Sequence, residues 1–169
     1  MAKLLLSLHV LAAVLAIGPV AVAASMFPKA MRHAHSEPGD REALATLRTL
    51  HRICRVYAGV GVAVPVFGFA TASSLGVLGS GWLITSIVLT TAAAAALALL
   101  ILPAQDSALD AARALDAAQA PGSAHAPGSG PGPGIRSAAR LAALTGVFNL
   151  LWATVTVLMI IRPGSTTGA

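Results

Sequence analysis

Four long apolar segments dominate this sequence and restrict what it can fold into. Their only charged residue is Arg140, and they cover Leu4–Ala24, Val56–Leu75, Trp82–Leu102 and Ala139–Ile161. A helix needs about 20 mostly apolar residues to cross the hydrocarbon core of a bilayer. Because lipid offers the backbone no hydrogen-bond partners, such segments must be helical. We therefore predict an all-α polytopic membrane protein, with residues 1–169 forming a single membrane domain built as an antiparallel four-helix bundle.

The composition excludes an ordinary water-soluble domain. Charged residues make up 10% of the chain, against about 25% in a typical soluble domain. The net charge of +5 would suit a nucleic-acid partner, but the basic residues adjoin the apolar segments, where they set topology and meet anionic lipid headgroups. We therefore expect the lipid bilayer, and no nucleic acid, as the partner. Cys54 is the single cysteine, so no intrachain disulfide can form.

The connections between the apolar segments differ in kind. Residues 25–55 are polar and basic, whereas 76–81 (GVLGSG) predict a tight turn. In the loop 103–138 the first half has helical spacing, and 121–134 reads as a flexible linker rich in Gly and Pro. Asp40 is placed as the N-cap of a helix that extends the second span out of the membrane.

Basic residues predict the orientation. Nine of the eleven Lys and Arg lie in or beside the loops 25–55 and 103–138, and only Lys3 and Arg162 lie at the opposite ends of the spans. By the positive-inside rule these loops are cytoplasmic and both termini lie outside, in the plasma membrane of a bacterium. The alternative is a cleaved secretory signal, because Lys3, the first apolar run and the small residues at 21–25 imitate one.

Small residues recur at helical spacing and predict the faces that pack. Helices in lipid associate where small side chains let their backbones approach. The second span then packs through Gly61, Pro65 and Gly68, and the fourth through Gly146, with Asn149 and Thr156 as polar contacts inside the bundle. Pro19 and Pro65 each remove a helix hydrogen bond, which predicts kinks.

His9 is the residue within the spans that is best suited to a chemical role. It shares a stripe with Ala13, Ala16 and other small residues, so we expect it to point into the bundle. An ionisable residue within a span is a functional candidate by default. Three interpretations stay open: a structural hydrogen bond to Thr156, Thr85 or Ser86; a contact to haem, a metal or a quinone; or a proton or substrate relay. His51 lies at the far end of the second span and cannot share a haem iron with His9.

A second group of potential ligands follows the first span. Residues 26–35 read MFPKAMRHAH. Thioethers suit Cu(I) and imidazoles suit several metals, so Met31, His33 and His35 are candidate metal ligands. The alternative is a basic loop at the membrane interface.

Two motifs resemble a known family. LHVLAAVLAIGP in the first span and VLMIIRPG at the end of the fourth resemble a family of bacterial four-span membrane proteins of unknown function. That family is distantly similar to the copper resistance protein D group and to the HemJ-type protoporphyrinogen oxidases. The resemblance implies haem or copper as possible cofactors and matches His9 to the histidine that begins the first motif. Such relatives often have Trp seven residues later, where this chain has Ala16.

The sequence favours a structural or accessory membrane component over an enzyme. Its small-residue faces and basic loops motivate this interpretation, with a membrane-protein partner or a homo-oligomer as the form of association. One alternative is a haem- or metal-linked redox protein that uses His9. Another is a transporter of small solutes or metals, suggested by Pro19, Pro65 and His9.

Overall fold

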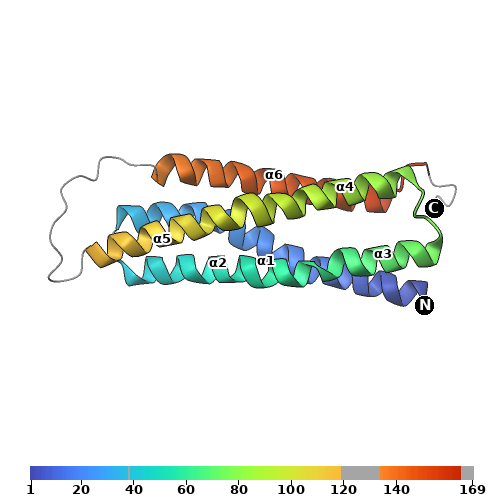
Figure 1. Cartoon of the computed structure of the whole chain (residues 1–169), viewed down its shortest axis with the longest axis horizontal. Helices are drawn as coiled ribbons and strands as arrows, with labels where there is room; N and C mark the ends of the chain where they lie inside the picture. Colours follow the sequence, from blue (N-terminus) through green and yellow to red (C-terminus); the bar gives the residue numbers. More distant parts are fainter. Residues whose placement is uncertain (38, 119–133, 165–169) are drawn as a thin grey trace.

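The chain forms a long bundle of antiparallel helices with both termini at one end (Figure 1). The computed structural model describes residues 1–37, 39–118 and 134–164. Its elements are α1 (Ala2–Ser36), α2 (Arg41–Gly61), α3 (Ala63–Leu75), α4 (Gly81–Ala95), the π-helical segment η1 (Ala96–Ile101), α5 (Leu102–Ala118) and α6 (Gly134–Ile161). Of the predicted linker 121–134, only Gly134 lies within the described residues.

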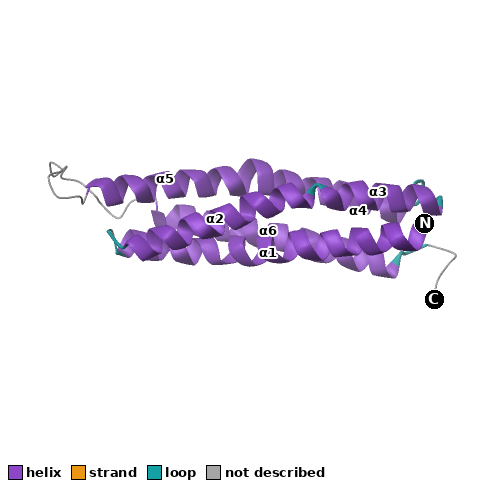
Figure 2. Cartoon of the chain, turned by 90° about the horizontal axis from the view of Figure 1, so that it is seen from below, coloured by secondary structure: helices purple, strands orange, loops and turns teal. Residues whose placement is uncertain are grey.

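The predicted four-helix architecture is confirmed. Four helical stretches are long and apolar enough to cross a membrane: Ala2–Ser36, Arg41–Leu75, Gly81–Ala118 and Arg136–Ile161. α1 packs against α2, α3 and α6, while α4 packs against α6 and α2 against α5. Viewed from below, the helices run nearly parallel to one axis along the whole length (Figure 2). Large apolar side chains such as Val14 and Leu150 are exposed along the spans, as a lipid-facing surface requires.

Part of the first predicted loop is helical. The segment 25–36 belongs to α1, which continues through Pro28. It is helical because Phe27, Met31 and Ala34 bury one face in a core shared with Leu44 and Leu47 of α2. α2 then begins at Arg41 and forms a helical hairpin with α1.

The third span also runs on beyond the expected boundary. α4, η1 and α5 follow one another without a gap from Gly81 to Ala118. Pro103 lies in the first turn of α5, directly after the π-helical segment. Proline has no N–H to donate to the preceding turn. The π-helical segment before it changes the hydrogen-bond pattern of that turn from i→i+4 to i→i+5, so Pro103 is tolerated there. The helical pattern expected after residue 103 is therefore confirmed, but as a continuation of the span.

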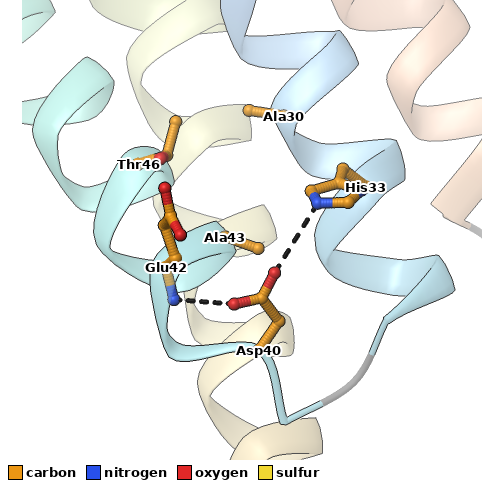
Figure 3. Close-up of a pocket in the computed structure, with 6 residues that line it drawn as sticks. All are labelled: Ala30, His33, Asp40, Glu42, Ala43 and Thr46. Carbon is orange, nitrogen blue, oxygen red and sulfur yellow. Dashed lines mark hydrogen bonds and ion pairs between the residues drawn. The ribbon is translucent and has the colours of Figure 1, made fainter.

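Asp40 is the N-cap of α2, as predicted. Its side chain accepts a hydrogen bond from the backbone N–H of Glu42 at 2.8 Å. This bond satisfies one of the donors that every helix start leaves free. Beside it, a surface pocket lies between α1 and α2, lined by Ala30, His33, Asp40, Glu42, Ala43 and Thr46 (Figure 3).

Candidate functional site

His9 binds the backbone of α3. Its Nδ1 lies 2.9 Å from the carbonyl oxygen of Val64. A carbonyl can only accept, so Nδ1 carries the proton and donates, and Nε2 of the neutral ring keeps its lone pair. The imidazole is partly buried.

Gly68 makes room for the imidazole. A Cβ atom at residue 68 would lie 2.8 Å from Cε1 and 3.0 Å from Nδ1 of His9, closer than side chains tolerate. Gly68 thus contributes to the packing of α3 on α1 by letting the backbone of α3 lie against the imidazole ring of His9. Gly61 lies against α1 as well, with Ala16 Cβ 3.9 Å from the position of its missing Cβ.

The partners expected for His9 bond elsewhere. Thr156, Thr85 and Ser86 donate to carbonyl groups of their own helices, at Trp152, Gly81 and Trp82. Such bonds to the preceding turn satisfy a hydroxyl without any neighbouring helix. Thr156 is also exposed, so its predicted contact inside the bundle is wrong.

Pro65 explains why Val64 faces α1. Pro65 cannot donate to the carbonyl of Gly61, and the helix is interrupted at Val62, where α2 gives way to α3. Beyond the interruption Val64 is buried and Pro65 is exposed. Placing Pro65 in the packed face was therefore wrong, although the predicted disturbance of the helix near it is present.

The face that α6 turns inward is also different from the predicted one. Gly146 is exposed, and a Cβ atom there would meet nothing within 4 Å. The buried residues of α6 are instead Ala138, Leu141, Thr145, Phe148 and Val155. Large side chains fill the space between helices, so the small residues are left facing outward. Asn149 does reach a neighbouring helix, because its Nδ2 donates to Ser25 Oγ of α1 at 3.2 Å.

Met31, His33 and His35 do not converge. Met31 is buried in the core between α1 and α2. His33 is exposed, and its Nε2 lies 3.6 Å from Asp40 Oδ2, whereas Nδ1 of His35 bonds the carbonyl of Met31. Residues two apart on a helix point in different directions. Within the described part of the chain, no three His, Cys, Asp or Glu side chains are placed to hold a metal ion.

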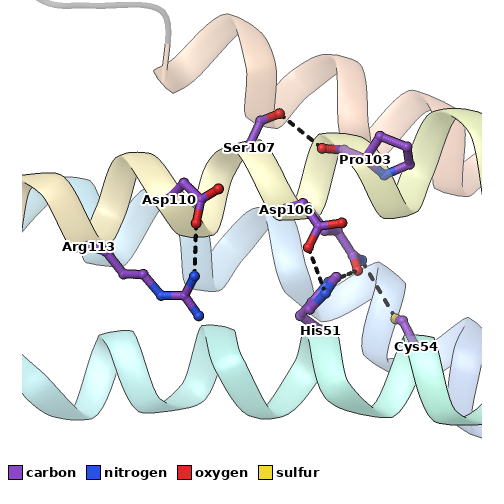
Figure 4. Close-up of polar contacts among 8 residues, drawn as sticks. His51, Cys54, Pro103, Asp106, Ser107, Asp110 and Arg113 are labelled. Carbon is purple, nitrogen blue, oxygen red and sulfur yellow. Dashed lines mark hydrogen bonds and ion pairs between the residues drawn. The ribbon is translucent and has the colours of Figure 1, made fainter.

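Sequence reasoning missed a polar cluster between α2 and α5. His51 is buried, and its Nδ1 lies 3.2 Å from Gln105 Oε1 while its Nε2 lies 3.0 Å from Asp106 Oδ1. The amide nitrogen of Gln105 faces Cys54 Sγ at 3.6 Å (Figure 4). Gln105 and Cys54 are fully buried. A signal was present in the sequence. His51 and Cys54 are three residues apart and so share one helix face, and Gln105 and Asp106 are the first polar residues after the third apolar segment.

The two histidines therefore offer different chemistry. His9 presents the lone pair of a neutral ring with a fixed tautomer, which can ligate a metal or accept a hydrogen bond. His51 has an oxygen atom beside each ring nitrogen. The histidines lie on separate helix pairs, α1 with α3 and α2 with α5.

Comparison with known proteins identifies the family. No curated protein and no solved structure matches the chain. Residues 3–163 match the family described as predicted integral membrane protein (DUF2269). This match covers all four candidate spans. The chain is a multi-pass integral membrane protein and belongs to the DUF2269 family.

Proposed function

We propose that this protein is a non-catalytic component of a larger membrane assembly, which docks a transmembrane helix of a partner on α6. The docking surface is the α6 stripe, defined as Ala142, Gly146 and Ala153 with Asn149 and Thr156 on the same side. The observation that carries the proposal is the exposure of Ala142, Gly146 and Ala153 on a helix that buries Leu141, Phe148 and Val155 against its neighbours.

Small residues on a lipid-facing surface favour helix association. Apolar side chains gain little by leaving lipid for protein, so helices in a bilayer associate mainly through close packing and interhelical hydrogen bonds. Gly146 has open space where a Cβ would lie, which lets a partner's backbone approach. Asn149 lies at the edge of the stripe, where its Nδ2 donates to Ser25 Oγ of α1. Its Oδ1 is buried and has no hydrogen-bond partner among the described residues.

The proposal includes an orientation. By the bounds of their helices, the nine basic residues of the loops and helix ends lie in the half of the bundle away from the termini. The positive-inside rule then places that end in the cytoplasm and both termini outside. A reporter domain fused after Ala169 tests this: alkaline phosphatase should be active there, and a fluorescent protein that needs the cytoplasm should be dark.

Enlarging Gly146 tests the docking surface. The full-length protein is purified in mild detergent from its native membrane, as wild type and as Gly146→Leu. We expect the wild type to elute as a complex larger than one chain, and the variant to lose at least about tenfold of the co-purifying material. Gly59→Leu is the matched control, because Gly59 is also an exposed helical glycine with nothing within 4 Å of its missing Cβ. A wild type that always migrates alone, or equal behaviour of the two variants, contradicts the proposal.

His9 favours a second candidate function, a haem- or metal-linked membrane protein. The supporting observation is the hydrogen bond from Nδ1 to the Val64 carbonyl, since histidine ligands of metals almost always donate their other ring N–H in this way. In this candidate Nε2 of His9 would be the ligand that holds the group. Such a group would supply one-electron chemistry.

The visible absorption spectrum and the bound metal content distinguish this candidate. A Soret band or stoichiometric metal in the purified wild type, absent from His9→Ala, is the expected result for a ligand. A colourless and metal-free wild type removes the candidate and leaves the association proposal untouched.

A further inference from the structure

The cluster of His51, Gln105, Asp106 and Cys54 has two arrangements in which both ring nitrogens of His51 have a complementary partner. In the arrangement observed, both ring nitrogens of His51 face oxygen atoms, at 3.2 Å and 3.0 Å. Oxygen atoms of an amide and a carboxylate accept hydrogen bonds and do not donate them. A neutral imidazole would therefore turn a lone pair toward one of these oxygens. An imidazolium, with a proton on each nitrogen, turns a donor toward Gln105 and a positive charge toward Asp106.

The second arrangement needs a neutral ring and a rotated amide. If Nε2 keeps its proton toward Asp106, Nδ1 becomes an acceptor and requires a donor at Gln105. Rotation of the Gln105 amide by 180° exchanges its oxygen and nitrogen and provides that donor. The amide oxygen then lies toward Cys54, whose thiol can donate a weak hydrogen bond. Binding of one proton to His51 is thus coupled to the orientation of Gln105 and to the role of the thiol.

Asp106 connects this buried ring with water. The side chain of His51 is 8% exposed, whereas that of Asp106 is 53% exposed. The Nε2–Oδ1 approach is close enough for an ion pair but is not aligned as a hydrogen bond, and Nε2 has no other hydrogen-bond partner among the described residues. The carboxylate can therefore exchange protons with solvent and pass them to the imidazole.

The other charged residues of the neighbouring helix segments are exposed, and Asp106 is the charged group that lies against the ring. On α2, Arg48, Arg52 and Arg55 are exposed. α1 contributes the buried apolar residues Phe27 and Met31 to the core at this end, while its Lys29 is exposed. Asp110 of α5 pairs with Arg113 at 2.8 Å.

We propose that His51, Gln105 and Asp106 form a proton-binding site where the bundle leaves the membrane at its basic end, and that proton binding switches the orientation of the Gln105 amide between α2 and α5. The site joins the two helices directly after η1. A π-helical segment often marks a functional position in a helix, and here it ends one turn before Gln105.

Nuclear magnetic resonance tests the proposal on the full-length protein in nanodiscs, with ¹⁵N-labelled histidine and glutamine side chains. Between pH 5 and 8, one ring signal that is absent from His51→Asn should change from protonation at both nitrogens to protonation at Nε2 alone. The side-chain amide signal of Gln105 should move with the same midpoint. Asp106→Asn removes the negative charge beside the ring. The midpoint should then require an about tenfold higher proton concentration.

Asp110→Asn is the matched control, since it removes an exposed carboxylate one turn away on the same helix. It should leave the midpoint unchanged. If His51→Asn does not fold, the wild type, Asp106→Asn and Asp110→Asn still decide the question. A His51 ring whose protonation stays constant over this range overturns the proposal. So does a titration that leaves Gln105 unmoved, or equal effects of Asp106→Asn and Asp110→Asn.

Discussion

At the scale of single residues, the imidazole of His9 is held by one hydrogen bond and fits because a glycine lies beside it. His9 donates to the Val64 carbonyl, and Gly68 leaves the space that the ring occupies. A buried polar group without a partner costs about 1–3 kcal/mol. The pair His9 and Gly68 avoids that cost between α1 and α3.

Gly68→Ala should separate His9 from Val64. The new Cβ would lie 2.8 Å from Cε1, so the ring must rotate away and lose its hydrogen bond. We expect a loss of about 1 kcal/mol in the free energy of unfolding, measured by thermal unfolding in detergent. Gly59→Ala, where nothing lies within 4 Å, should be neutral or should stabilise by up to about 1 kcal/mol, because alanine favours helix more than glycine. Equal effects of the two substitutions would show that the ring is not held as described.

The sequence indicated the inward position of His9 but not its partner. Its stripe of small residues predicted the face correctly, since Ala16 and Val20 are buried. The partner is a backbone carbonyl, and its position depends on the interruption at Val62. No spacing of side chains encodes such an acceptor. The contacts of His51 were missed for a related reason, because they depend on how far α5 continues beyond the third apolar run.

At the scale of helices, the end of the bundle away from the termini is the best-packed part of the chain. Most of the larger core cluster lies there, including Phe27, Leu47, Ile101 and Leu141. Two features of sequence support this end: the N-cap Asp40 and the apolar face that continues past the charged residues of α1 and α2. Toward the termini the core reduces to a cluster of Ala12, Ala16 and Val64.

Asp40→Ala should destabilise the α1–α2 hairpin. The cap bond to Glu42 N–H is lost, which typically costs about 1 kcal/mol. Asp40→Asn keeps an acceptor and should retain most of that stability. The contact with His33 is at the surface and contributes little, so His33→Ala should behave like the wild type in the same unfolding experiment. A larger loss for His33→Ala than for Asp40→Ala would contradict the capping role.

Leu47→Ala should be among the most damaging changes at this end. Leu47 is fully buried between α1 and α2, and removal of such a side chain leaves a cavity that costs about 2–5 kcal/mol. Leu11→Ala is the control, because Leu11 is 55% exposed on the lipid-facing side. Its truncation should change the free energy of unfolding by well under 1 kcal/mol. Similar losses for both variants would mean that residues 25–55 do not pack as a helical hairpin.

The inward face of α6 could not be read from its small residues. Close approach of backbones is one way to pack helices, and filling the space with large side chains is another. α6 uses the second way, with Leu141 and Phe148 almost completely buried. Ala142 and Gly146 fall on the adjacent face. The spacing of residues limits the buried face of α6 to a few possibilities. Which of them is buried depends on the volume that side chains must fill between the four helices.

At the scale of the whole molecule, the bundle is longer than a bilayer is thick. α1 has 35 residues and so extends about 50 Å, whereas the hydrocarbon core measures about 30 Å. Because the charged residues gather away from the termini, the excess length must lie at that end. The number of spans could be predicted from hydropathy, and Asp40 indicated where the extension of the second span begins, but the continuation of α1 through Pro28 to Ser36 was not predicted.

Photochemical cross-linking in intact membranes tests the central claim, association through α6, most directly. A photoreactive benzoylphenylalanine is placed at Ala142 or Ala153 of the α6 stripe, and at Val14 of α1 as a lipid-facing control that is 65% exposed. The account predicts a discrete cross-linked band from either stripe position and only lipid adducts from Val14. A stripe that yields lipid adducts alone would contradict it.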